Sequence, residues 1–166
     1  MKLAFLTPGT GNYYCGVCMR DNSLAKQLIN HGHEVTMLPT YLPHFLDEDP
    51  ASEEHPIFFG GINVYLQHKF SLFRKTPVWI DKAFDSKWML KKAAARSGMT
   101  SSKDLGEITL STFRGEDGPL AKEVNKVVQW FKQHGAPDVI LLSTIMLAAI
   151  GKVLKRELNV PVLGFL

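Results

Sequence analysis

The 166-residue sequence contains only two cysteines and carries little net charge. Both cysteines lie in one short C-x-x-C, which excludes the disulfide framework of small secreted domains, so we expect an intracellular protein with reduced thiols. The 19 basic and 16 acidic residues leave a net charge of +3, which is too small to indicate a nucleic-acid surface. No nucleic-acid partner is therefore expected.

Signals for export or for crossing a membrane are missing too. The opening segment, MKLAFLTPG, has one lysine and an apolar run that is too brief for the core of a signal peptide. The longest apolar segment, Val139 to Ile150, is interrupted by Ser143 and Thr144 and falls short of the roughly 20 residues that a bilayer span needs. We expect a cytoplasmic protein with one domain over residues 1–166.

Buried strands alternate with amphipathic helices at both ends of the chain. The first apolar run is closed by Pro8 and Gly9, and the first helix has Asp21 or Asn22 near its start and ends at His31-Gly32. The expected elements are a strand over Lys2–Thr7, a helix over about Cys18–Asn30, a strand over His33–Leu38, a helix from Pro119 to Gly135, a strand over Asp138–Leu142, a helix over Ile145–Leu158 and a strand over Val160–Leu166.

This order predicts an α/β protein, a Rossmann-like three-layer sandwich with a mainly parallel sheet and helices on both faces. The terminal run VPVLGFL should form a strand inside the sheet, with no polar tail or following helix to close the layer. Because natural termini are usually peripheral, we expect the chain to be the amino-terminal piece of a longer protein.

The middle of the chain is less regular. Residues Thr40 to Pro56 are rich in proline and acidic residues and predict a solvated excursion. The basic amphipathic helix expected over Pro77–Arg96 should pack one stripe on the core, with contact to an anionic membrane surface as the alternative. The other expected elements are a hairpin or bent strand over Ile57–Phe59 and Ile62–Phe70, and a helix that follows Ser101 or Ser102 and stops near Gly115.

The turn after the first strand, TPGTGNYYCGVC, is the strongest functional signal. In open parallel sheets such a turn presents amides to ligands at the carboxyl ends of the strands. Gly9, Gly11 and Gly16 permit close backbone approach, and the helix start favours a phosphate or carboxylate. The alternative is that the glycines only let the strand turn into its helix.

Other interpretations of this turn and of the nearby residues compete with the anion-binding one. A dinucleotide fingerprint lacks its third glycine, because Tyr14 stands there, and no G-K-[ST] follows to make a P-loop. A glutaredoxin-like redox domain using Cys15 and Cys18 remains an alternative, as does a non-catalytic Rossmann-like binding module. No metal is expected, because the one imaginable set matches no recognised ligand spacing: His44, Asp47, Asp49 and His55.

Two segments carry a family resemblance: GTGNYYCGVCMRDNSLAKQLINHGHEVTMLPTYLP and PDVILLSTIMLAAIGKVLKRELNVPVLGFL. They resemble the amino-terminal lobe of family 4 glycosyltransferases of the two-lobed GT-B fold. In that family a glycine-rich turn follows the first strand, a helix runs through G-H-E-V into the second strand, and a P-D-V strand, an aliphatic helix and a V-P-V strand come later. These features occur here in the same order.

The resemblance implies the acceptor-side lobe of an enzyme that transfers a sugar from a nucleotide-diphosphate sugar to a hydroxyl acceptor, without a further cofactor. The donor would be held mainly by a second lobe that these residues do not contain, so the chain alone is expected to be inactive. No catalytic base is assigned. The residues implied at the site are a substrate- or phosphate-facing loop of Gly9, Thr10, Gly11, Asn12 and Gly16, with Ser143 and Thr144 on the acceptor side.

Overall fold

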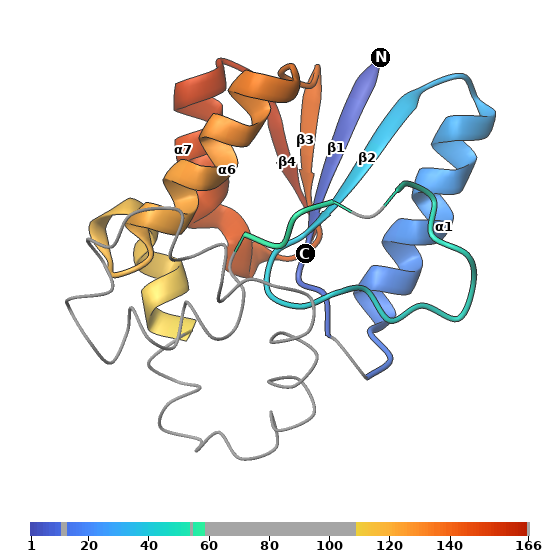
Figure 1. Ribbon diagram of the computed structural model, residues 1–166, viewed down its shortest axis with the longest axis horizontal. Helices are drawn as coiled ribbons and strands as arrows, with labels where there is room; N and C mark the ends of the chain where they lie inside the picture. Colours follow the sequence, from blue (N-terminus) through green and yellow to red (C-terminus); the bar gives the residue numbers. More distant parts are fainter. Residues whose placement is uncertain (11–12, 54, 59–108, 166) are drawn as a thin grey trace.

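The computed structural model describes residues 1–10, 13–53, 55–58 and 109–165. They form a parallel four-stranded sheet in the order β2-β1-β3-β4 with helices on both faces (Figure 1), which confirms the predicted Rossmann-like α/β fold. The elements are β1 (Lys2–Thr7), α1 (Gly16–Asn30), β2 (Glu34–Pro39), the 3₁₀ helix η3 (Gly115–Asp117), α6 (Ala121–His134), β3 (Val139–Leu142), the 3₁₀ helix η4 (Ile145–Leu147), α7 (Ala148–Leu158) and β4 (Val162–Gly164).

The strand order reverses between β1 and β3. Along β1, Leu6 lies beside Leu38 of β2 on one side and Leu142 of β3 on the other. The chain leaves β1 through α1 to reach β2, and it returns through α6 to β3 on the opposite side of β1. The carboxyl ends of β1 and β3 therefore flank a topological switch point, where open α/β sheets bind their ligands.

The sheet is buried on both faces. Leu3 and Phe5 pack in a cluster with Ala25 of α1, whereas Ala4 and Leu6 pack in a second cluster with residues of α6 and α7. Successive side chains of a strand point to opposite faces, so a strand covered on both sides needs an unbroken apolar run. This is why β1 has the bounds expected from the sequence.

Helix α6 presents the predicted apolar stripe to the sheet, with Val124, Val127 and Phe131 all buried. It begins at Ala121, two residues later than expected, and ends at His134, which is followed by Gly135, whose φ of 96° favours glycine. The 3.6-residue period of buried positions explains why the sequence indicated this helix.

Helix α1 differs from the expectation at its start. It begins at Gly16, and the expectation that Asp21 or Asn22 lies near its start is wrong, because both are buried in the helix interior. The Asn22 side chain instead forms two hydrogen bonds with the loop that follows β2. Its Nδ2 donates to the Asp49 carbonyl at 3.1 Å, and its Oδ1 accepts a hydrogen bond from the Ala51 amide at 2.8 Å.

Strand β4 is shorter than expected and lies at the end of the strand order. Among the described strands it pairs only with β3, and Leu163 is 57% exposed, so the prediction of a strand inside the sheet is wrong here. The described residues between Thr40 and Pro56 form no helix or strand, as expected, and residues 109–114 are helical. The ranges Ile62–Phe70 and Pro77–Arg96 lie outside the described residues.

Candidate functional site

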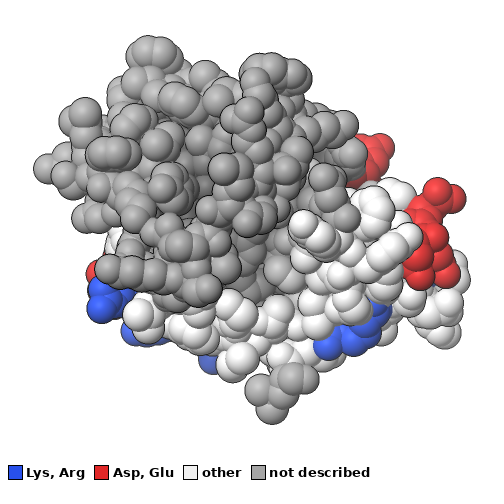
Figure 2. Space-filling view, turned by 90° about the horizontal axis from the view of Figure 1, so that it is seen from below, with Lys and Arg blue, Asp and Glu red and all other residues white. Residues whose placement is uncertain are grey.

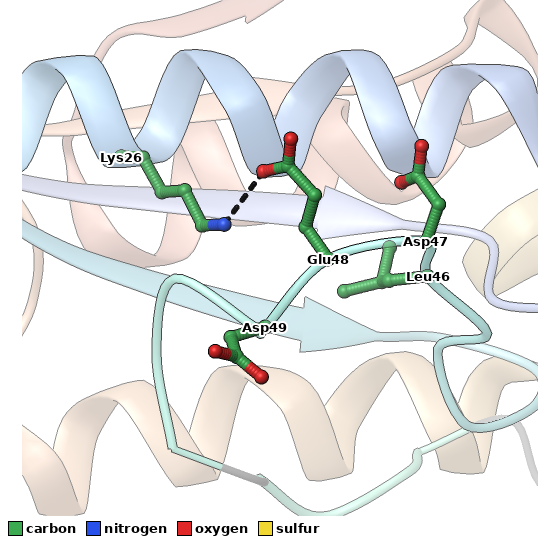
Figure 3. A pocket seen from close by; sticks show the side chains of 5 residues that line it. All are labelled: Lys26, Leu46, Asp47, Glu48 and Asp49. Atoms are coloured by element: carbon green, nitrogen blue, oxygen red, sulfur yellow. Dashed lines mark hydrogen bonds and ion pairs between the residues drawn. The ribbon is translucent and has the colours of Figure 1, made fainter.

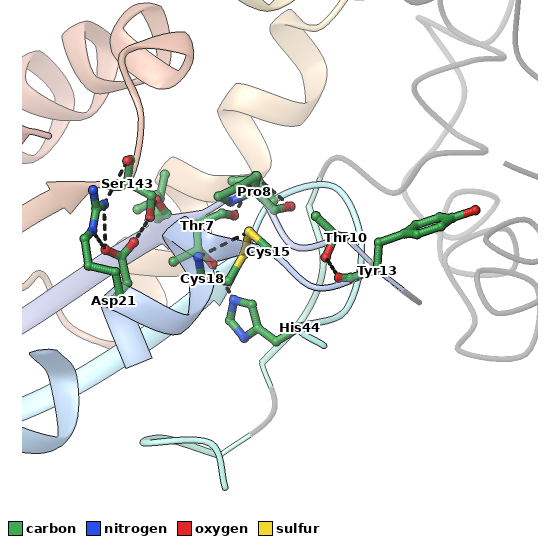
Figure 4. Close-up of a disulfide and its surroundings, with 12 residues drawn as sticks. Thr7, Pro8, Thr10, Tyr13, Cys15, Cys18, Asp21, His44 and Ser143 are labelled. Atoms are coloured by element: carbon green, nitrogen blue, oxygen red, sulfur yellow. Dashed lines mark hydrogen bonds and ion pairs between the residues drawn. A yellow bond between two sulfur atoms is a disulfide. The ribbon is translucent and has the colours of Figure 1, made fainter. Parts of the chain in front are cut away.

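The candidate site lies at the carboxyl edge of the sheet, where several chain segments converge (Figure 4). Strand β1 ends at Thr7, β3 is followed by Ser143, and the first turn of α1 begins at Gly16. The Thr40 amide donates to the Thr7 carbonyl at 2.8 Å, and the Ser143 amide donates to the Leu6 carbonyl at 3.0 Å. These main-chain bonds extend the sheet ladder past the strand ends and fix the floor of the site.

The opening turn is held by its own backbone. Gly9 has a φ of 65°, and a Cβ placed on it would lie 1.7 Å from the carbonyl oxygen of Leu42. Glycine is therefore required at this position by the close approach of another chain segment, whatever ligand binds nearby. The Thr10 hydroxyl donates to the Tyr13 carbonyl, while Gly11 and Asn12 lie outside the described residues.

The start of α1 is the open part of the predicted loop. Gly16 is exposed, and a Cβ placed on it would find no atom within 4 Å. The amides of Gly16 and Val17 have no hydrogen-bond acceptor within the described part of the chain. Such first-turn amides and the partial positive charge of a helix start are suited to an anionic group.

Ser143 and Thr144 are both occupied by internal hydrogen bonds. The buried Ser143 hydroxyl contacts the Leu6 carbonyl at 2.9 Å and one oxygen of the Asp21 carboxylate. The Thr144 hydroxyl accepts the Met146 amide at 2.9 Å and so caps η4. Ser143 therefore belongs to the support of the site, and of the two only the half-buried Thr144 reaches its surface.

The buried carboxylate of Asp21 lies beneath this edge of the sheet. Its Oδ1 atom accepts hydrogen bonds from Arg20 Nε at 2.9 Å and from Arg20 Nη2 at 2.7 Å. Arg20 Nη2 also donates to the Ser143 carbonyl at 3.0 Å. The guanidinium lies 4.5 Å from the ring centre of Phe165, which follows β4. This network joins α1 to the segments after β3 and β4.

Sequence reasoning missed this role of Asp21. A signal was available in the sequence, because Asp21 lies at helical spacing from Cys18 and Ala25, two small apolar residues; the structure buries all three. A carboxylate within such a stripe requires buried partners, since burying an unpaired charge is costly.

His44 contacts the same edge, because its Nε2 is hydrogen-bonded to the Thr7 hydroxyl. Burial lowers the pKa of His44 below its ordinary value by removing water from the charged ring, and the Asp21 carboxylate acts in the opposite direction. His55 lies elsewhere, with its ring 5.6 Å from that of Trp130.

The residues of the imagined metal set are not gathered. Asp47 and Asp49 point in opposite directions at a shallow hollow beside α1, where Lys26 Nζ pairs with Glu48 Oε2 at 2.7 Å (Figure 3). Among the residues that the structure describes, no three histidine, cysteine, aspartate or glutamate side chains come together as a metal site.

The lowered pKa of His44 predicts a pH-dependent stability. The unfolded chain takes up a proton below the ordinary pKa of 6.5, whereas the folded chain does so only at lower pH. The free energy of unfolding should therefore fall as pH drops below 6.5 and stay level, in this contribution, above it. Urea titrations at several pH values should show a shallower decline for His44→Gln, and equal slopes for both proteins would contradict the assignment.

Cys15 and Cys18 are paired as a disulfide across the first turn of α1, whereas the sequence predicted reduced thiols. Cys15 precedes the helix and Cys18 lies in its first turn, which brings their Cα atoms to 5.2 Å, within the range that a disulfide spans. The Cys18 amide also donates to Cys15 Sγ at 3.2 Å.

Exposed aromatic side chains lie near the site. Tyr14 and Phe45 are exposed, with ring centres 4.9 Å apart. Figure 2 looks onto the side where the strands end, and there the described acidic and basic side chains stand in separate small groups among uncharged residues. None of the described helices is both long enough and apolar enough to span a bilayer.

Comparison with protein-family models, with curated proteins and with solved structures finds no match to this chain. The fold and its carboxyl edge thus define a Rossmann-like α/β protein with a candidate anion site.

Proposed function

We propose that this chain is the acceptor-side, amino-terminal lobe of a GT-B glycosyltransferase, which moves a sugar from a nucleotide-diphosphate sugar to a hydroxyl acceptor. The observation that carries the proposal is the position of the first turn of α1, whose Gly16 and Val17 amides lie next to the switch point between β1 and β3. The resemblance of the two terminal segments supplies the reaction class.

In this proposal the lobe binds the substrates and stabilises the negative charge of the departing diphosphate. As the bond from the sugar to the diphosphate breaks, negative charge grows on the departing diphosphate, and fixed amides facing it lower the barrier. Arg20 is held by Asp21 and the Ser143 carbonyl, so the backbone at Gly16 and Val17 is the electropositive group open to a ligand. Thr144 lies on the acceptor side of this edge, and the second lobe would hold the rest of the donor.

A charge change at Gly16 tests the proposal. Because a Cβ at this position meets open space, Gly16→Asp should fold normally, and a negative charge at a helix start should raise the free energy of unfolding by about 0.3 to 1 kcal/mol. The same charge repels a diphosphate. In the complete two-lobed protein, transfer from a panel of nucleotide-diphosphate sugars should have a kcat/KM reduced by about tenfold or more, since about 1.4 kcal/mol of repulsion suffices.

Gly16→Asn is the matched control, because it has nearly the same shape without the charge. It should retain most of the activity, and added salt should narrow the gap between the two variants. Equal activity of the aspartate and asparagine variants would contradict a diphosphate at this turn. Binding of a ligand without turnover of any nucleotide sugar by the complete protein would favour the non-catalytic binding module.

A further inference from the structure

The disulfide at the start of α1 has two unequal ends. Cys15 keeps 6% of its surface exposed, whereas Cys18 is fully buried. Cys15 is flanked by Tyr14, whose side chain is exposed, and by Gly16, which has no side chain to block approach. Of the two cysteines, Cys15 is therefore the one that retains exposed surface for a molecule arriving from solvent.

The backbone around Cys15 is arranged to hold a negatively charged sulfur. Its Sγ already accepts the Cys18 amide at 3.2 Å, and it occupies the N-cap position of α1. A helix start and a donated amide both favour a thiolate over a thiol. Cys18 lies on the buried stripe that contains Ala25, where a neutral thiol packs as a small apolar group.

We propose that Cys15 and Cys18 form a reversible dithiol–disulfide centre that exchanges with small thiols, with Cys15 as the attacked sulfur and Cys18 as the leaving group. A thiolate from solvent attacks Cys15 Sγ, the bond between Cys15 and Cys18 breaks, and Cys18 leaves as a thiolate that takes up a proton. A second small thiol then attacks the sulfur of the first, which releases Cys15. Two small thiols are oxidised to one disulfide while the protein disulfide is reduced to two thiols.

The opposite assignment conflicts with the burial of the two residues. Attack on Cys18 would require an external thiol to reach a residue that is closed off by the helix and the sheet. Exchange rates depend on access to the attacked sulfur and on which sulfur can leave. The exchange involves no sugar nucleotide, so its test is separate from that of the glycosyltransferase proposal.

Differential alkylation of the wild-type chain tests the proposal without any substitution. The chain is reduced, freed of reductant and treated briefly with iodoacetamide at neutral pH, and the label on each cysteine is measured by mass spectrometry. In the folded protein Cys15 should react at least about tenfold faster than Cys18, as expected for a thiolate that keeps some exposed surface beside a thiol that is fully buried. In denaturant the two rates should become similar.

Exchange with glutathione supplies the second measurement. The oxidised fraction in buffers of set glutathione and glutathione disulfide should be the same from either direction, and Cys18→Ser should accumulate a mixed disulfide at Cys15 that Cys15→Ser does not form at Cys18. Circular dichroism checks that both variants fold. Equal alkylation rates in the folded wild-type chain, failure of the reduced pair to re-form its disulfide, or equal trapping in both variants would overturn the proposal.

Discussion

Replacing Asp21 with alanine is expected to lower the free energy of unfolding by about 1 to 3 kcal/mol, the range for leaving a buried hydrogen-bonding group without its partner, because the Arg20 side chain is 40% exposed and water can solvate its charge. The Asp21 carboxylate is fully buried and is contacted by Arg20 and by the Ser143 hydroxyl. Its removal leaves a guanidinium without its anion and opens a gap between α1 and the segment after β3. Chemical denaturation followed by circular dichroism measures the effect.

Asp21→Asn separates charge from shape. The amide keeps an oxygen for one hydrogen bond but loses the charge that faces Arg20, so the loss of stability should be smaller than with alanine. Combining Asp21→Ala with Ser143→Ala should cost less than the sum of the single changes, because the two side chains share one contact. A loss below about 1 kcal/mol for Asp21→Ala would show that the network does not hold this edge together.

Gly9→Ala is expected to destabilise the fold by about 3 kcal/mol or more, which combines a strained positive φ with a clash. A Cβ at this position would lie 1.7 Å from a main-chain oxygen, that of Leu42, so the backbone itself must move. The free energy of unfolding from urea titration measures the effect.

Gly16→Ala is the matched control, because its Cβ meets open space and the residue lies in a helix. It should be neutral or stabilising by up to about 1 kcal/mol. A Gly9→Ala protein as stable as the wild type would mean that the turn after β1 does not pack against the Leu42 backbone.

The fold was largely predictable because its main signals are local. The continuous apolar run of Lys2–Thr7 follows from burial of this strand on both of its faces. The apolar stripe along α6 follows from burial of this helix on one face. The place of the last strand was not predictable in this way, because sequence periodicity shows that a strand is buried or exposed but not which strands lie beside it. Pairing in the structure puts β4 at the edge of the described sheet.

The candidate site was only partly predictable. Its location after β1 follows from the topology of parallel sheets, but the role of each residue depends on contacts between distant segments. Gly9 is required by Leu42, and Ser143 is bound to Asp21, 122 positions earlier in the chain. No short pattern in the sequence encodes those contacts. Of the described loop residues Gly9, Thr10 and Gly16, which were expected to face a ligand, Gly16 is the one with open space around it.

Amide hydrogen exchange on the complete protein, with and without a nucleotide-diphosphate sugar, tests the central claim most directly. The Gly16 and Val17 amides lack an acceptor within the described chain, so they should exchange quickly in the free protein and slow markedly when the diphosphate binds. Residues in the middle of α6, far from this edge, should be unaffected. Saturating binding of the nucleotide sugar with no change in exchange at the first turn of α1 would contradict the account.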